Sequence, residues 1–150
     1  MKIVVGADHR GFQLKQLIAK WLRGEGHEVV DVGTTNDDSV DYTDFALDAA
    51  EKVAHGEAQR GILICGSGAG MSIAANKVQG VRAALAVSDE GARLARAHND
   101  ANVLALGAWQ EGDADRVHAI VEAFLNTEFE GGRHARRVDK ITAYEEKKGR

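Results

Sequence analysis

Short apolar runs alternate with helical patterns along this chain, and this alternation limits the possible folds more than any other feature. The runs lie at residues 3–5, 29–32, 62–65, 81–87 and 103–106. Runs without a polar face are typical of parallel strands that helices cover on both sides. The alternation therefore predicts a parallel sheet between two helical layers. At 150 residues, we expect one domain, spanning 1–150, whose core needs neither disulfide nor metal.

The apolar spacing between these runs predicts the helices. One helical face is formed by Leu14, Leu17, Ile18, Trp21 and Leu22, before Gly24 and Gly26 end the pattern. The same spacing recurs over 117–125, and a last helix is expected over about 133–146. We interpret these faces as core.

Composition excludes several classes of protein. A formal net charge of −4 argues against general nucleic-acid binding, which needs a basic face. No stretch approaches the ~18 apolar residues of a membrane span. The single cysteine cannot form an internal disulfide, and the first residues are too poor in apolar side chains for a signal peptide. We therefore expect a protein of the reducing cytoplasm, with no membrane partner.

That single cysteine, Cys65, stands where the third apolar run breaks into Gly66-Ser67-Gly68-Ala69-Gly70, ahead of a helical pattern that begins near Met71. Glycines permit a tight turn, after which backbone N–H groups at a helix N-terminus point at a bound oxyanion. The same N-terminus favours thiolate over thiol. A buried structural cysteine is the alternative, since free cysteine is often a small core residue.

Better-known glycine-rich patterns do not fit this loop. A dinucleotide fingerprint has Gly-x-Gly-x-x-Gly, normally after the first strand, whereas here the glycines are alternate and follow the third. A phosphate-binding Walker sequence needs Lys and then Ser or Thr after its last glycine, and Met71-Ser72 follows instead. A cysteine phosphatase would need an arginine where Met71 stands. Base chemistry beside an oxyanion hole remains.

Two further loops should lie at the same sheet edge as Cys65, because each of them follows the carboxyl end of a strand. Ligands of such folds bind at this edge. The first contains Asp8 and His9, and the second leads through Asp41 to Tyr42. Taken singly, Asp8 could be a helix N-cap, His9 a surface histidine and Tyr42 a packing residue. Their convergence on Cys65 favours a common site.

His98 and Asn99 follow a helical stretch and directly precede the fifth strand, so they belong to the opposite edge of the sheet. His98 could simply be a histidine at a helix C-terminus, which the helix dipole favours. If it is catalytic, it must act on Cys65 of another subunit, which predicts a symmetric dimer with two composite sites.

Arg133 and Arg137 are spaced i, i+4, so they form either a solvated surface face or a clamp on one phosphate.

Five motifs in combination carry a resemblance to a known family. They are Gly-Ala-Asp-His-x-Gly-Phe at 6–12, Asp41-Tyr42, the cysteine loop within 61–77, His98-Asn99-Asp100, and Glu-Gly-Gly-Arg-His-x-x-Arg at 130–137. Together they resemble the B-type ribose-5-phosphate isomerases, whose family also contains allose-6-phosphate and galactose-6-phosphate isomerases. The resemblance implies an α/β fold: a three-layer α/β/α sandwich with a Rossmann-like, five-stranded parallel sheet of order 2-1-3-5-4. It also implies a homodimer or a dimer of dimers with shared active sites.

The resemblance further implies a role for each candidate residue. Cys65 would be the base that moves a proton between C2 and C1 of an open-chain sugar phosphate, through a cis-enediolate. The oxyanion would be held by Ser67 and by the backbone N–H groups of Gly66, Gly68, Ala69 and Gly70. Asp8 and the partner subunit's His98 would assist ring opening, and Asn99 and Tyr42 would position hydroxyl groups. The phosphate would be bound by His9, Arg133 and Arg137. No metal or organic cofactor is implied.

One departure from the family pattern concerns the substrate. Trp109 stands where the family commonly has a phosphate-binding arginine. The tryptophan is either a packing substitution or the sign of another sugar phosphate, such as allose 6-phosphate, galactose 6-phosphate or a tetrose phosphate. Ribose 5-phosphate is the leading expectation, and a non-catalytic sugar-phosphate-binding subunit is a further alternative.

Overall fold

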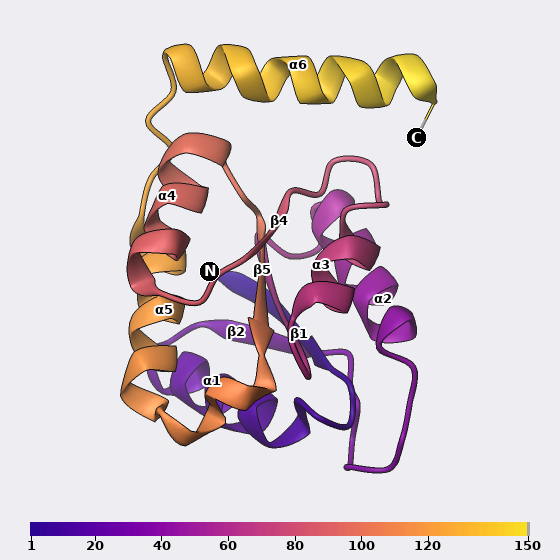
Figure 1. Ribbon diagram of the computed structural model, residues 1–150, viewed down its shortest axis with the longest axis vertical. Coiled ribbons are helices and arrows are strands. Elements are labelled where there is room, and N and C mark those ends of the chain that lie inside the picture. The colour runs from indigo at the N-terminus through magenta and orange to yellow at the C-terminus, as the bar shows by residue number, and fades with distance from the viewer. Residues whose placement is uncertain (150) are drawn as a thin grey trace.

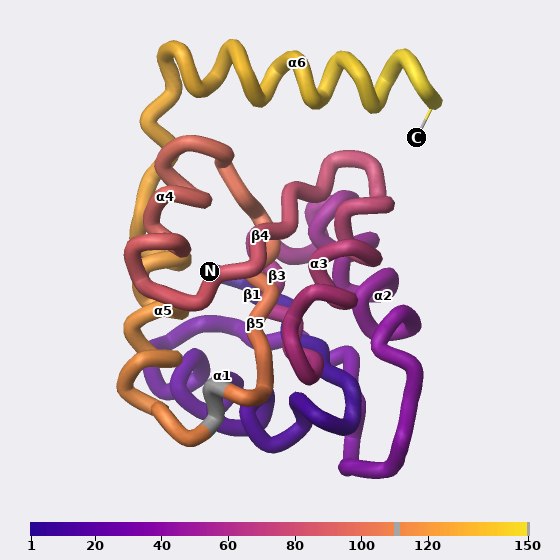
Figure 2. Tube along the Cα trace, in the orientation of Figure 1, coloured from indigo at the N-terminus to yellow at the C-terminus, as the bar shows by residue number. Residues whose placement is uncertain are grey.

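The computed structural model describes residues 1–149, and the side chains of all of these except Gln110 and Glu111 (Figure 2). The described residues contain five strands: β1 (Lys2–Ala7), β2 (Glu28–Asp31), β3 (Arg60–Cys65), β4 (Ala83–Leu85) and β5 (Val103–Gly107). They form one parallel sheet of order β2-β1-β3-β5-β4. The predicted fold class and strand order are confirmed.

Two helical layers enclose this sheet (Figure 1). One face packs against α1 (Phe12–Gly24), α4 (Asp89–Asn99) and α5 (Ala114–Asn126), and the other against α2 (Tyr42–Ala54) and α3 (Ala69–Ala75). A short 3₁₀ helix, η1 (Ala108–Gly112), joins β5 to α5. The last helix, α6 (Arg133–Lys148), lies outside both layers.

The strand residues alternate between two apolar cores, which explains why the strand sequences have no polar face. In β3, Ile62 and Ile64 belong to the core shared with α1, α4 and α5. Leu63 and Cys65 belong to the core shared with α2 and α3. Because Cys65 belongs to the second core, its side chain points to the face that α3 covers. Each fully buried aliphatic side chain of either core contributes ~1.5–3 kcal/mol to the stability of the fold.

A buried ion pair joins α1 to β2. The Nζ atom of Lys15, whose side chain is 1% exposed, lies 2.6 Å from a carboxylate oxygen of Asp31. The same ammonium group donates to Gln16, and Asp31 also accepts the backbone N–H of Gly33. Removing one member of such a pair leaves the other charge without a partner.

Two predicted boundaries are wrong. The fourth strand covers only Ala83–Leu85 rather than 81–87, because β4 lies at the sheet edge and pairs with β5 alone. Helix α3 begins at Ala69, two residues before the expected Met71, because Gly68 adopts a left-handed conformation with φ 83° and acts as its N-cap.

Helix α6 runs across the top of the molecule in Figure 1, beyond the amino ends of the strands. It packs against α4, and only His134 and Val138 among its residues are buried. Ile141 and Tyr144 are exposed on the same helix. Among residues 1–149, no helix combines the length and the apolar character needed to cross a membrane.

Candidate active site

The strand register brings three strand ends together at one edge of the sheet. Ala7 pairs with Ile64, and Cys65 pairs with Gly107. The backbone N–H of Asp8 donates to the carbonyl oxygen of Ile64 over 3.1 Å, so β1 and β3 remain paired up to the loops. Asp8 and Cys65 are therefore neighbours, as the order of the strands predicted.

Cys65 is buried, with 5% of its surface exposed, and its thiol faces the glycine loop. The Sγ atom accepts the backbone N–H of Gly68 over 3.2 Å. Ser67 is exposed in the same loop, and its hydroxyl oxygen accepts the N–H of Ala69 over 3.2 Å. The first N–H groups of α3 have no acceptor within the helix. The thiol is thus buried at a strand end, at the margin of the core shared with α2 and α3, and it faces one backbone donor of the loop.

Gly68 fixes the shape of this loop. Its φ of 83° lies in the left-handed region, and a Cβ atom there would lie 2.6 Å from Leu85 and 2.9 Å from the backbone of Leu106. No other residue satisfies both restrictions, because a side chain would be strained and would collide. The N–H groups of the loop therefore point in fixed directions before any ligand arrives.

Asp8 is buried beside the loop, with 6% of its surface exposed. The alternative, that Asp8 caps a helix, does not hold: Gly11 is the N-cap of α1, which has no side-chain cap. One carboxylate oxygen of Asp8 instead accepts the N–H groups of Arg10 and Gly11, over 2.9 and 3.1 Å. The turn that holds Asp8 needs glycine at position 11, where a Cβ would lie 2.6 Å from the carbonyl oxygen of Ile64.

His9 and Tyr42 join the same edge. The Nδ1 atom of His9 accepts the backbone N–H of Val40 over 3.2 Å, which assigns the proton of a neutral ring to Nε2 and leaves that atom as a donor. The ring of Tyr42, at the start of α2, packs against Gly70 of the cysteine loop. Asp8, His9, Tyr42, Cys65 and the loop therefore lie at the same edge of the sheet, where the strand ends led us to expect them.

Arg10 is a candidate residue that sequence reasoning missed. Its side chain is exposed, and its guanidinium carbon lies 3.9 Å from the place where a Cβ of Gly66 would stand. It is thus a cation directly beside the cysteine loop. The sequence feature that could have identified Arg10 is its position in the loop after the first strand, at the carboxyl edge of the sheet.

Trp109 also lies at this edge. Its indole ring folds back against Gly107, next to the carbonyl oxygen of Ser67, and 61% of the residue is exposed. In a single chain the ring therefore fills little core space, which weakens the interpretation of Trp109 as a packing substitution.

The remaining predicted site residues lie elsewhere in the chain. His98 and Asn99 end α4, ahead of β5, while Cys65 is level with the last residue of β5. The length of β5, ~13 Å, thus separates the two edges. Arg133 and Arg137 begin α6 and are exposed at the edge that carries His98. The structure brings these four residues into one region but not to Cys65 of the same chain.

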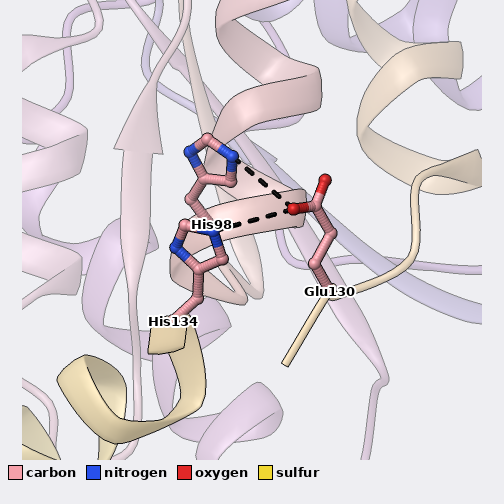
Figure 3. A group of neighbouring side chains, drawn as sticks. All are labelled: His98, Glu130 and His134. Atoms are coloured by element: carbon pink, nitrogen blue, oxygen red, sulfur yellow. Dashed lines mark ion pairs between the residues drawn. The ribbon is translucent and has the colours of Figure 1, made fainter. Parts of the chain in front are cut away.

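His98 belongs to a cluster with Glu130 and His134 (Figure 3). The two imidazole rings stack with their centroids 4.1 Å apart, and the Glu130 carboxylate lies beside both Nε2 atoms. Burial lowers the pKa of His134, and the nearby His98 and Arg133 lower it further, while Glu130 opposes them. A second group that could hold a metal ion contains Glu25, His118 and Glu122, on the outside of α1 and α5.

A cavity of about 740 Å³ lies apart from both regions. It is lined by α2, by the segment after α3 and by α6, including Leu47, Lys77 and Thr142. None of the predicted site residues lines it, so its size does not make it the site; the strand-end geometry is the stronger indicator.

Comparison with known proteins agrees with this geometry. Residues 3–141 match the family model described as Ribose/Galactose Isomerase. Ribose-5-phosphate isomerase B of Escherichia coli is 47% identical over 98% of each chain. A putative sugar phosphate isomerase of Bacillus subtilis is 46% identical over 98% of this chain and 99% of its own.

Solved structures give the same result. Ribose-5-phosphate isomerase B of Clostridium thermocellum is 53% identical, covers 98% of this chain and 99% of its own, and superposes with a TM-score of 0.94. Ribose-5-phosphate isomerase B of Mycoplasma genitalium with bound ribulose-5-phosphate is 46% identical, covers 97% of this chain and 96% of its own, and has a TM-score of 0.92. The chain described here belongs to the ribose/galactose isomerase family.

Proposed function

We propose that this chain is an aldose–ketose isomerase that interconverts ribose 5-phosphate and ribulose 5-phosphate. The observation that carries the proposal is the Sγ atom of Cys65, which is buried at a strand end and accepts the N–H of Gly68. Asp8 lies on the adjacent strand end, and the glycine loop directs one backbone donor at the thiol. Such an arrangement suits the removal of a carbon-bound proton next to a carbonyl group.

The proposed reaction moves one carbon-bound proton and one hydroxyl proton. The Cys65 thiolate removes the proton from C2 of the open-chain aldose, the C2 electron pair forms the C1–C2 double bond, and the carbonyl oxygen on C1 becomes negative. Gly66, Gly68, Ala69 and Gly70 supply N–H donors, with Ser67, to this cis-enediolate. The Cys65 thiol then returns the proton to C1, while the proton of the C2 hydroxyl moves to the C1 oxygen, which gives the ketose. One oxyanion donor typically contributes ~3–4 kcal/mol in the transition state.

The other candidate residues bind and open the sugar. Asp8 assists ring opening together with His98, Tyr42 and Asn99 position hydroxyl groups, and His9 binds the phosphate together with Arg133 and Arg137. Four of these residues lie at the edge away from Cys65, so each site takes them from a second copy of the chain. The exposed Ile141 and Tyr144 on α6 support such a homodimer, or a dimer of dimers, because they leave apolar surface for a partner.

A different sugar phosphate is the second candidate, and Trp109 is the observation that favours it. The exposed indole stands beside the cysteine loop and adds no positive charge there. A hexose 6-phosphate or a tetrose phosphate could use that surface differently from ribose 5-phosphate.

Two measurements test these proposals. The purified chain, incubated alone with aldose phosphates of four, five and six carbons, should show its highest kcat/KM with ribose 5-phosphate. Cys65→Ala should lose more than ~99% of turnover, since acid–base groups supply ~10²–10⁴-fold, while it still binds ribose 5-phosphate in calorimetry. Ser72→Ala, in α3 near the loop, is the matched control. More than a tenth of wild-type turnover in Cys65→Ala would exclude Cys65 as the base, and an inactive wild-type chain that still binds the sugar phosphate would favour a non-catalytic subunit.

A further inference from the structure

Arg10 occupies a fixed turn at the carboxyl edge of the sheet, between β1 and α1. One carboxylate oxygen of the buried Asp8 accepts the backbone N–H of Arg10 over 2.9 Å. The N–H of Gly11 donates to the same oxygen and to the carbonyl oxygen of Asp8, over 3.1 Å each. These contacts use only the backbone of Arg10, so the turn keeps its shape when the side chain is replaced.

The side chain of Arg10 extends from this turn to the start of the cysteine loop. Its Cζ and Nη1 atoms each lie 3.9 Å from the place where a Cβ of Gly66 would stand. The residue is exposed, and among the described side chains no carboxylate pairs with its guanidinium group, whereas Arg82 and Arg96 both pair with Asp100. The N–H donors of Arg10 are therefore available to an anion that binds beside Gly66.

The charges around the site make this arginine important. The loops that follow β1, β2 and β3, at 8–11, 32–41 and 66–68, contain no other arginine or lysine but carry the carboxylates of Asp8, Asp37, Asp38 and Asp41. A phosphate monoester has a charge of about −1.5 to −2 near pH 7, so these carboxylates repel it. The guanidinium group of Arg10 offsets this repulsion and can present paired N–H donors to two phosphate oxygens.

Trp109 approaches the cysteine loop from the other side and brings no charge. In the sheet, β3 lies between β1 and β5. Arg10 follows β1 and lies beside Gly66, whereas Trp109 follows β5 and lies next to the carbonyl oxygen of Ser67. Within one chain, an anion at the loop is therefore held from the β1 side, where the Nε2 donor of His9 precedes Arg10.

We propose that Arg10 binds the phosphate group of the sugar phosphate, from the same chain that supplies Cys65. The assignment rests on the proposed function. In that reaction the oxyanion on C1 forms against the loop N–H groups beside the buried thiol, so the exposed guanidinium suits the opposite, more strongly hydrated end of the substrate. Arg10 thus fixes the phosphate relative to Cys65 within one chain, while Arg133 and Arg137 reach the phosphate from the second copy.

The binding test uses the full chain with Cys65→Ala, so that turnover does not disturb calorimetry. Adding Arg10→Ala should weaken binding of ribose 5-phosphate and of inorganic phosphate about ten- to a hundredfold, as loss of a charge-assisted contact does, and should leave binding of unphosphorylated ribose unchanged. Arg10→Lys, which keeps the charge without the planar fork, should recover part of the loss. Arg23→Ala is the matched control: it removes an exposed arginine about 17 Å along α1, and it should leave every affinity unchanged.

Kinetics with Cys65 intact separate phosphate binding from a role at the thiol. Arg10→Ala should raise the KM for ribose 5-phosphate by a similar factor and leave the pH dependence of kcat as it is in the wild type. A shifted pH profile of kcat with unchanged affinity would mean that Arg10 acts on the Cys65 thiol, and would overturn the proposal. Unchanged phosphate affinity in Arg10→Ala, an equal loss for ribose and ribose 5-phosphate, or the same loss in Arg23→Ala would also overturn it. A wild-type chain that binds ribose 5-phosphate without isomerising it contradicts the isomerase proposal, and calorimetry still decides the role of Arg10.

Discussion

Subunit complementation gives the sharpest test of how the active site is assembled. Cys65 is level with the end of β5 and His98 precedes its start, so ~13 Å of strand separates them along one chain. Proton transfer needs contact of ~3 Å, or one intervening water. Cys65→Ala and His98→Ala should therefore each be inactive alone, yet they should restore activity when they share a dimer.

The expected recovery follows from counting sites. If equal amounts of the two variants are unfolded and reassembled together, half of the dimers are heterodimers. In each heterodimer one site has both Cys65 and His98 and the other has neither. The mixture should thus regain about a quarter of wild-type activity, because a two-fold axis gives every dimer two equivalent sites.

The assay is the formation of ribulose 5-phosphate from ribose 5-phosphate, with tags of different mass on the two variants to count heterodimers. The matched control mixes Cys65→Ala with the double variant Cys65→Ala/His98→Ala, which forms mixed dimers without any intact site. If heterodimers form and their activity stays at the level of this control, the shared-site proposal is refuted. His98 would then be structural, or would act within its own chain.

Three further predictions concern binding, stability and pH. Arg137→Ala should weaken binding of ribose 5-phosphate about ten- to a hundredfold, from the loss of a charge-assisted pair, and should leave binding of unphosphorylated ribose unchanged; equal loss for both sugars would exclude a phosphate contact. Asp31→Asn should lower the free energy of unfolding in urea by ~3 kcal/mol, because Lys15 would stay buried without its counter-charge, and adding Lys15→Met should recover most of it; no recovery would show that the pair is not the cause. A hydrogen bond with Glu25, and then burial, raise the pKa of Glu122 in the folded chain. The proton on Glu122 therefore stabilises the fold, fully below the unfolded pKa, and this stabilisation is lost as the pH rises through the folded pKa. Glu122→Gln should therefore become more stable relative to the wild type as the pH rises from the unfolded pKa through the folded pKa of Glu122, by less than ~1 kcal/mol at these partly exposed side chains. Urea unfolding at a series of pH values checks this, and a difference that does not change with pH would contradict the assignment.

The sequence predicts the layers of this fold well because its strands are apolar on both faces. The third run ends at Cys65, as expected, since the glycines that follow cannot continue a strand. Family resemblance supplied the strand order, which the structure confirms. The length of the edge strand β4 was overestimated, because an apolar run does not show where the strand stops pairing with its neighbour.

The sequence predicted at which edge of the sheet each candidate residue lies, but not the contacts that the residue makes. Chain direction alone separates His98 from Cys65, and the structure has them at opposite edges. That Asp8 holds a loop rather than a helix could not be predicted, because either use needs the same residue type at the same place. Arg10 and Glu130 were missed for a related reason: the neighbours of an exposed charged side chain depend on tertiary packing.

The limited anchoring of α6 has a consequence for its dynamics. With only His134 and Val138 buried, the half of the helix beyond Val138 loses little contact area when it unwinds. Its free energy of local opening is therefore far below that of the sheet. In the homodimer proposed above, docking of a second subunit on α6 would slow the exchange of its amide protons with solvent. The order of the C-terminal turns would then depend on protein concentration, and dilution would loosen the chain first at the end that follows Arg137.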